Sequence, residues 1–81
     1  MPLEELKNST TRVIGSKQVK KALAKGGVKK VYIAVDAEHH IIEPIKKLCQ
    51  QHQVEFVLAE SMDALGRACG IDVGSATVAL L

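Results

Sequence analysis

The five residues Val31–Val35 are apolar throughout, rich in β-branched side chains, and followed by Asp36. A strand with one face in water alternates apolar and polar residues, whereas a strand covered on both faces reads as a continuous apolar run. We therefore expect this segment to be a central strand of a sheet, with other elements packed on both of its faces.

Three segments carry apolar residues at the spacing of an amphipathic helix. Ser16 is a suitable N-cap for the first helix, which Gly26 would end, and Ser61 is a suitable N-cap for the third, which runs toward Gly70. Pro44 is expected near the start of the second helix or at a break in it. Helices are thus predicted over residues 17–25, between 39 and 52, and from 61 toward 70.

Short apolar segments between these helices predict further strands over 12–14, 54–58 and 76–81, and a short helix is expected over 3–7. Helices that alternate with strands indicate an α/β domain, with helices on both faces of a sheet of about four strands. A chain of 81 residues with 47% hydrophobic and 25% charged residues has room for one core. We expect one domain over residues 1–81, as a monomer.

The charges are distributed unevenly along the chain. Residues 1–30 hold eight Lys or Arg and two Glu, whereas residues 31–81 hold three basic and seven acidic residues. A polyanion such as RNA is a common target of a basic patch of this kind, although a solvated basic face is the alternative.

Several other classes of protein are disfavoured. No apolar run approaches the roughly 20 residues that cross a bilayer, and Cys49 and Cys69 lie in apolar segments with no signal peptide before them. Free thiols in a reducing cytoplasm are therefore expected, with no membrane partner. No four ligands stand at zinc spacings and no nucleophile constellation can be assigned, so we expect no metal, no cofactor and no enzyme activity.

Two nucleic-acid or nucleotide folds are also disfavoured. An RNA-recognition motif or an oligonucleotide-binding barrel stacks bases on aromatic side chains, and the aromatic residues here, Tyr32 and Phe56, fall in presumed core strands. Gly66, Gly70 and Gly74 fit neither the Rossmann nor the Walker spacing, which argues against a nucleotide-binding enzyme.

Two segments carry the candidate site. Gly15-Ser16-Lys17-Gln18 feeds a glycine turn into a helix N-terminus, where free backbone amides and the helix dipole favour a phosphate. Lys17, Lys21 and Lys25 follow one another at i, i+4 spacing, and an anionic partner would relieve their repulsion. The loop 70–75 brings Ile71 and Val73 between a helix and the last strand. These side chains either tuck under the loop as part of the core or form a platform for an unstacked base.

Ile14-Gly15-Ser16-Lys17-Gln18, followed by Lys21 and Ala22, and Leu65-Gly66-Arg67-Ala68-Cys69-Gly70-Ile71-Asp72-Val73 resemble segments of the L7Ae family of ribosomal and kink-turn-binding proteins, in its short bacterial form. The resemblance spans nearly the whole chain. It implies a three-layer α/β/α sandwich with a mixed four-stranded sheet. It also implies recognition of the kink-turn, a sharply bent RNA duplex with tandem sheared G·A pairs.

In that family an Asn, a Glu and a Lys on the first helix contact the G·A pairs. Lys21 matches the Lys, whereas Lys17 stands at the Asn position and Gln18 at the Glu position. The family's aliphatic-acidic-aliphatic loop, which packs on a flipped-out nucleotide, matches residues 71–73, with Asp72 in place of Glu. Phosphate contacts are expected from Lys20, Lys25, Lys29, Lys30 and Arg67.

The expected RNA-binding residues are therefore Gly15, Ser16, Lys17, Gln18, Lys20, Lys21, Lys25, Arg67, Ile71, Asp72 and Val73. The expected function is structure-specific binding of kink-turns in ribosomal or regulatory RNA, as a ribosomal-protein-like component. The alternative is a ribosome-associated structural or protein-interaction module of the same fold that no longer recognises the kink-turn.

Overall fold

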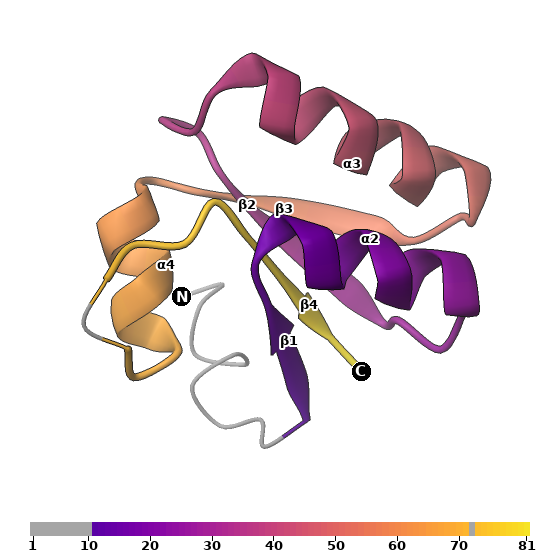
Figure 1. Cartoon of the computed structure of the whole chain (residues 1–81), viewed down its shortest axis with the longest axis horizontal. Coiled ribbons are helices and arrows are strands. Elements are labelled where there is room, and N and C mark those ends of the chain that lie inside the picture. Colours follow the sequence, from indigo (N-terminus) through magenta and orange to yellow (C-terminus); the bar gives the residue numbers. More distant parts are fainter. Residues whose placement is uncertain (1–10, 72) are drawn as a thin grey trace.

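The computed structural model describes residues 11–71 and 73–81 of the chain. The helix predicted over 3–7 and the expected site residue Asp72 lie outside the described residues. The described elements, in chain order, are β1 (Arg12–Ile14), α2 (Ser16–Lys25), β2 (Lys30–Ala34), α3 (His39–Gln51), β3 (Glu55–Ala59), α4 (Met62–Ala68) and β4 (Thr77–Leu80) (Figure 1).

The four strands form one mixed sheet in the order β1-β4-β2-β3. β2 runs parallel to β3 and antiparallel to β4, and β4 is also antiparallel to β1. β2 therefore has a neighbour on each side, and its residues Val31, Tyr32, Ile33 and Ala34 are all buried. The prediction of a central strand covered on both faces is confirmed, although the strand begins at Lys30 and leaves Val35 exposed.

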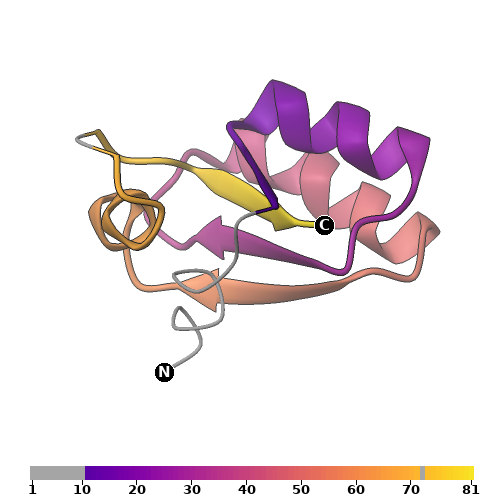
Figure 2. The same cartoon turned by 90° about the horizontal axis from the view of Figure 1, so that it is seen from below.

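Helices cover both faces of the sheet. In β1 successive side chains point to opposite faces. Val13 points toward α2, where it lines a hollow with residues of that helix, and the Arg12 guanidinium reaches the carbonyl of Cys69 at the end of α4. α2 and α3 pack against each other on the first face, and α4 packs against β2, β3 and β4 from the second (Figures 1 and 2). The predicted α/β sandwich with a mixed four-stranded sheet is confirmed.

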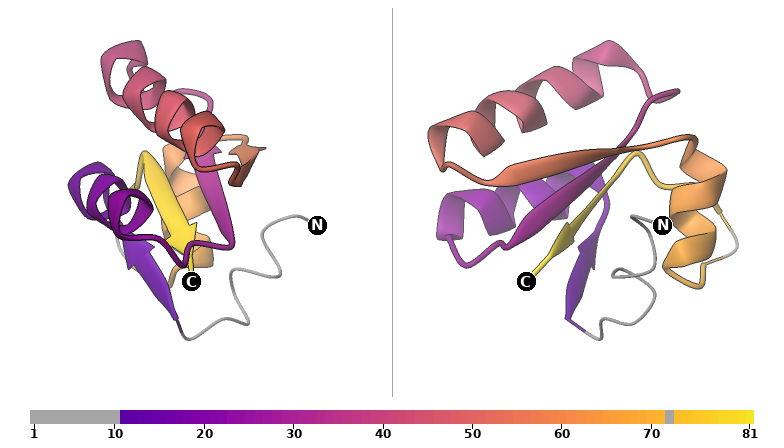
Figure 3. Two further views of the ribbon diagram at one scale, coloured as in Figure 1. Left: turned by 90° about the vertical axis from the view of Figure 1, so that its right-hand side faces the viewer. Right: turned by 180° about the vertical axis from the view of Figure 1, so that it is seen from behind.

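The core lies mainly between the sheet and the pair of helices α2 and α3. Val19 and Leu23 of α2 and Ile45 and Cys49 of α3 are almost completely buried there, at the helical spacing that the sequence indicated. Leu65 of α4 is fully buried on the other face. The end-on view in Figure 3 shows α2 and α3 on one side of the sheet. This packing fixes the start of α2 relative to the end of the sheet.

Two expectations about helix ends were wrong. Gly15, with φ of 101°, is the N-cap of α2, and Ser16 is already the first helical residue with no capping hydrogen bond. The chain reverses from β1 into α2 within one residue, and a positive φ of this kind favours glycine. Pro44 neither starts nor breaks α3, which continues from His39 to Gln51 around it. Burial of Ile45 and Cys49 beyond the proline offsets the hydrogen bond that it removes.

Two other predicted helix ends agree with the structure, and the strands predicted over 54–58 and 76–81 are observed with ends shifted by one residue, as Glu55–Ala59 and Thr77–Leu80. Ser61 Oγ accepts a hydrogen bond of 3.0 Å from the Ala64 amide, as expected of an N-cap. Gly26, with φ of 94°, ends α2. At the start of α4 and at the end of α2, the predicted capping residues thus form hydrogen bonds with backbone groups of the helix.

Thr77 presents a first testable feature of the core. Its hydroxyl Oγ1 is fully buried and has no hydrogen-bond partner among the residues that the structure describes. A buried unpaired hydroxyl costs about 1–3 kcal/mol, and an apolar group of the same shape removes that cost. We expect Thr77→Val to leave the protein as stable as before or to stabilise it by up to about 1 kcal/mol, measured by urea unfolding. A loss of more than about 1 kcal/mol would contradict this account.

Candidate functional site

The turn between β1 and α2 presents free backbone amides at one end of the sheet. The Gly15 amide donates to the carbonyl of Thr77 at 3.1 Å, and the Gly15 carbonyl accepts from the Val19 amide at 2.9 Å. These bonds hold the first turn of α2, with Lys17 and Gln18, against the start of β4. The first turn contains no acidic residue. The positive end of the helix dipole therefore faces outward without compensation, which favours an anion.

The lysines of α2 are exposed. Lys17, Lys20, Lys21 and Lys25 all lie on the solvent side of the helix. Near the start of α3, Nδ1 of His39 lies 4.0 Å from Oε1 of Glu43 and Nδ1 of His40 lies 3.1 Å from Oε2 of Glu38. No carboxylate in the described ranges pairs with a lysine of α2. Four cations along one helix of ten residues repel one another, so an anionic partner is the natural compensation.

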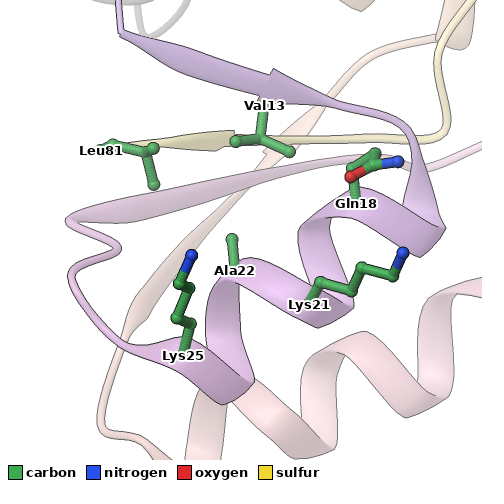
Figure 4. Close-up of a pocket in the computed structure, with 6 residues that line it drawn as sticks. All are labelled: Val13, Gln18, Lys21, Ala22, Lys25 and Leu81. Atoms are coloured by element: carbon green, nitrogen blue, oxygen red, sulfur yellow. The ribbon is translucent and has the colours of Figure 1, made fainter.

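Two of these lysines border a hollow next to the edge strand β1. Figure 4 shows Gln18, Lys21 and Lys25 along one side and Val13, with Leu81, along the other. The hollow has a volume of about 290 Å³, and Ala22 completes its lining. Gln18 and Lys21 thus share one surface, where the sequence placed two contacts to bases. Lys17 is not part of this lining.

The loop after α4 is held tightly at its start. The Ile71 amide donates to the Gly66 carbonyl at 3.1 Å, and the Gly70 amide donates to the Arg67 carbonyl at 3.0 Å. With Gly70 at φ of 75°, these bonds form a Schellman motif, which closes the helix and sets the direction of the chain beyond it.

The loop then folds back over α4. A Cβ atom at Gly66 would collide with the carbonyl of Val73, and one at Gly74 would lie 3.0 Å from Cβ of Met62. The Ser75 amide also donates to the Met62 carbonyl at 3.1 Å. The close approach of the loop backbone therefore requires glycine at position 66, and Gly74 is tightly packed against Met62.

The loop treats its two aliphatic side chains differently. Ile71 is half-buried and packs against the core, whereas 71% of Val73 is exposed. The partial burial of Ile71 agrees with the interpretation as a satellite of the core, whereas the platform for an unstacked base stays a prediction, for which Val73 is the exposed candidate. A solvent-exposed valine on a tightly held loop is a suitable contact for a flat apolar group.

The structure places the turn and the loop at the same end of the sheet. The Thr77 carbonyl accepts from the Gly15 amide and also from Ser75 Oγ, at 2.9 Å. One carbonyl at the start of β4 therefore joins the last residue of the loop to the residue that caps α2. A ligand at this end of the molecule can contact both segments.

The remaining expected residues are arranged less closely. Arg67 is exposed on α4, and Lys29 is exposed beyond the far end of α2. Lys30 pairs with Leu80, at the end of the sheet opposite to Thr77. Lys29 and Lys30 are therefore remote from the turn and the loop.

The described residues give little support to a metal site, a membrane-spanning helix or a reactive thiol. No three His, Cys, Asp or Glu side chains among them are grouped as metal ligands, and no helix there is long and apolar enough to cross a membrane. Cys49 and Cys69 are free and buried. Burial raises the pKa of both thiols, although Arg12 partly opposes the rise at Cys69. Both thiols are thus protonated and weakly nucleophilic at neutral pH.

Together, the fold and this surface define a small α/β protein with an exposed basic helix beside an aliphatic loop. The sequence matches the ribosomal protein L7Ae/L30e/S12e/Gadd45 family over residues 2–81. The chain belongs to this family, as the resemblance in its two motifs indicated.

Similar proteins support this assignment. A protein of Caldanaerobacter subterraneus subsp. tengcongensis that is named an RNA-binding protein is 48% identical over 68 residues, which is 84% of this chain and 83% of that protein. Another so named, from Halalkalibacterium halodurans, is 44% identical over 80 residues, or 99% and 98% of the two chains. The family and these names agree with the prediction that the chain is not an enzyme.

The fold is shared with solved structures. The structure of the Giardia lamblia 15.5kD RNA binding protein superimposes with a TM-score of 0.86 and 25% sequence identity, over 96% of this chain and 66% of that one. The structure of a protein of unknown function from Bacillus halodurans superimposes with a TM-score of 0.84 and 24% identity, over 96% and 78% of the two chains. The second likeness establishes the fold alone.

Proposed function

We propose that this protein binds RNA and recognises the kink-turn, with the first turns of α2 in the widened major groove and the loop 70–75 on a flipped-out nucleotide. The observation that carries the proposal is the bonding of both segments to the Thr77 carbonyl, which holds them together at one end of the sheet. Family membership and relatives named as RNA-binding proteins support it.

The expected chemistry divides between the two segments. The amides at the start of α2 and the unpaired lysines suit phosphates, and Gln18 and Lys21 on their shared surface suit the O6 and N7 edges of purines. Val73, exposed on its loop, suits the face of an unstacked base. Ordinary A-form RNA has a major groove too narrow for side chains to read, so recognition requires the groove to be opened by a bend.

Binding of this kind performs no chemical reaction. A protein that fits the bent RNA and not the extended RNA raises the population of the bent state by its difference in affinity for the two states. The protein would therefore act by stabilising RNA architecture, in a ribosomal or a regulatory RNA.

The proposal can be tested by titration into two RNAs at two salt concentrations. The first RNA contains a kink-turn, and in the second the sheared G·A pairs are replaced by Watson–Crick pairs. We expect tight binding to the first RNA only, with an affinity that falls as salt rises. Equal, salt-sensitive binding to both RNAs would show a nonspecific basic surface.

The second candidate function is a ribosome-associated interaction module of the same fold without kink-turn specificity. Lys17 and Gln18 favour it, because they stand where the family has Asn and Glu. The double variant Lys17→Asn with Gln18→Glu separates the two functions. If it gains kink-turn discrimination that the natural chain lacks, the natural chain has lost that specificity.

Val73 provides a test of the loop contact. Because 71% of its side chain is exposed, Val73→Ser is expected to change the free energy of unfolding by less than about 0.5 kcal/mol. If Val73 packs on a base, the same change weakens kink-turn binding by about 1 kcal/mol or more, a loss that fluorescence anisotropy can measure. Unchanged affinity would exclude the contact.

A further inference from the structure

Arg12 connects the two segments of the candidate site through a long-range hydrogen bond. Its Nη2 atom donates to the Cys69 carbonyl at 2.6 Å, in a partly buried contact between residues 57 positions apart in the chain. Arg12 lies in β1, three residues before the turn at Gly15, and Cys69 caps the end of α4, immediately before the loop 70–75.

The Cys69 carbonyl is a suitable partner for a guanidinium. The Schellman bonds at this helix end use the carbonyls of Gly66 and Arg67, and the carbonyl of Cys69 takes part in neither. Unsatisfied carbonyls at a helix C-terminus carry the negative end of the helix dipole, and a bond from an ionised donor is about twice as strong as one between neutral groups.

We infer that Arg12 is a positioning residue for RNA recognition, which fixes the loop 70–75 relative to the start of α2. This inference rests on the proposed function. With the Thr77 carbonyl, which bonds to Gly15 and Ser75, the Arg12 bond holds the loop at both of its ends. Arg12 acts through Cys69 and needs no contact with RNA, because its guanidinium is partly buried and donates to the Cys69 carbonyl.

The first test needs no RNA. In Arg12→Gln, amide hydrogen exchange at Ile71 and Ser75, followed by NMR, should accelerate by about tenfold, whereas exchange at Cys49 in α3 should stay unchanged. Arg12→Lys, which keeps a charged donor, should restore part of the protection. Unchanged exchange at Ile71 and Ser75 would overturn the inference, and so would acceleration that is equal in all three places.

The second test uses a kink-turn RNA and the same RNA with an abasic site at its flipped-out nucleotide. Arg12→Gln should weaken binding of the intact RNA by about fivefold or more and binding of the abasic RNA by less than about twofold. Equal losses on both RNAs would indicate a direct phosphate contact and overturn the inference. Lys47→Gln on α3 controls for the lost charge.

These tests separate the inference from the proposed function. If the natural protein does not distinguish kink-turn RNA from its Watson–Crick control, the proposed function fails and the exchange measurement still decides whether Arg12 positions the loop. If the natural protein recognises the kink-turn and the loop amides of Arg12→Gln exchange as before, the inference alone fails.

Discussion

Lys21→Ala is expected to weaken binding of kink-turn RNA by about 1–3 kcal/mol, which corresponds to roughly 5- to 150-fold in affinity. Lys21 is exposed, borders the hollow beside Gln18, and has no carboxylate partner in the described ranges. Its removal therefore takes away a cation directed at the proposed RNA surface and leaves no buried group unpaired. The stability of the protein should change by less than about 0.5 kcal/mol.

The matched control for Lys21→Ala is Lys47→Ala. Lys47 is also an exposed lysine on a helix, but it lies on α3, away from the turn and the loop. Both variants lower the net charge equally, so a general electrostatic effect would weaken RNA binding equally in both. A selective loss at Lys21, measured by anisotropy on the kink-turn RNA, supports recognition by α2. Unchanged affinity in Lys21→Ala would favour the interaction module.

Salt dependence separates the role of Lys21 further. If Lys21 only neutralises a phosphate, its loss weakens binding to all RNAs and reduces the slope of log K against log salt by about 1. If Lys21 reads a G·A pair, the loss is much larger on the kink-turn RNA than on the Watson–Crick control.

The sequence was most informative about the fold where burial decides local structure. The run Val31–Val35 predicted a central strand, because an apolar segment without alternating polar residues must be covered on both faces of the sheet. The order of the strands could not be predicted in the same way. β4 lies between β1 and β2, and this placement depends on pairing between segments far apart in the chain, such as Ile14 with Val78 and Ile33 with Thr77.

Errors in the sequence-based predictions arose where the folded chain overrode the local preference of a residue. Ser16 has the side chain of an N-cap, but the chain must reverse at Gly15, and the residue with positive φ took the capping position. Pro44 disfavours a helix interior, but the buried face of α3 outweighs this local preference.

For the candidate site, the sequence predicted exposed side chains such as Lys21 and Val73 and missed the interactions that hold the turn and the loop in place. Lys21 and Val73 could be found from the spacing of charges and from the glycines around the loop. The Arg12 contact with Cys69, and the double role of the Thr77 carbonyl, depend on side chains or strands that meet only in the folded chain. Neither interaction has a local sequence signal.

Gly66→Ala is expected to lower stability by about 1–3 kcal/mol, with a fall in Tm of roughly 4–8 °C for each kcal/mol in a domain of this size. A Cβ atom at position 66 would collide with the Val73 carbonyl oxygen, and it would lie 3.2 Å from the Cα atom of Gly74. These are backbone atoms, so no side-chain rotation relieves the contact. The loop must move away from α4, and Val73 must move with it.

The sign of this effect is diagnostic, because helix propensity alone predicts the opposite result. Alanine is better than glycine inside a helix by about 1 kcal/mol, so Gly66→Ala would stabilise α4 if the loop were not packed on it. Gln50→Ala, an exposed change on α3, controls for helix propensity in general. Thermal unfolding followed by circular dichroism distinguishes the outcomes, and a rise in Tm for Gly66→Ala would refute the packing of the loop on α4.

The same variant links the packing of the loop to recognition. At a temperature where Gly66→Ala is folded, displacement of Val73 should weaken kink-turn binding about as much as Val73→Ser does, and the two changes together should weaken it by less than the sum of their separate effects. Full additivity would mean that Gly66 and Val73 affect RNA binding independently, and the loop would then not be a single contact held in place by α4.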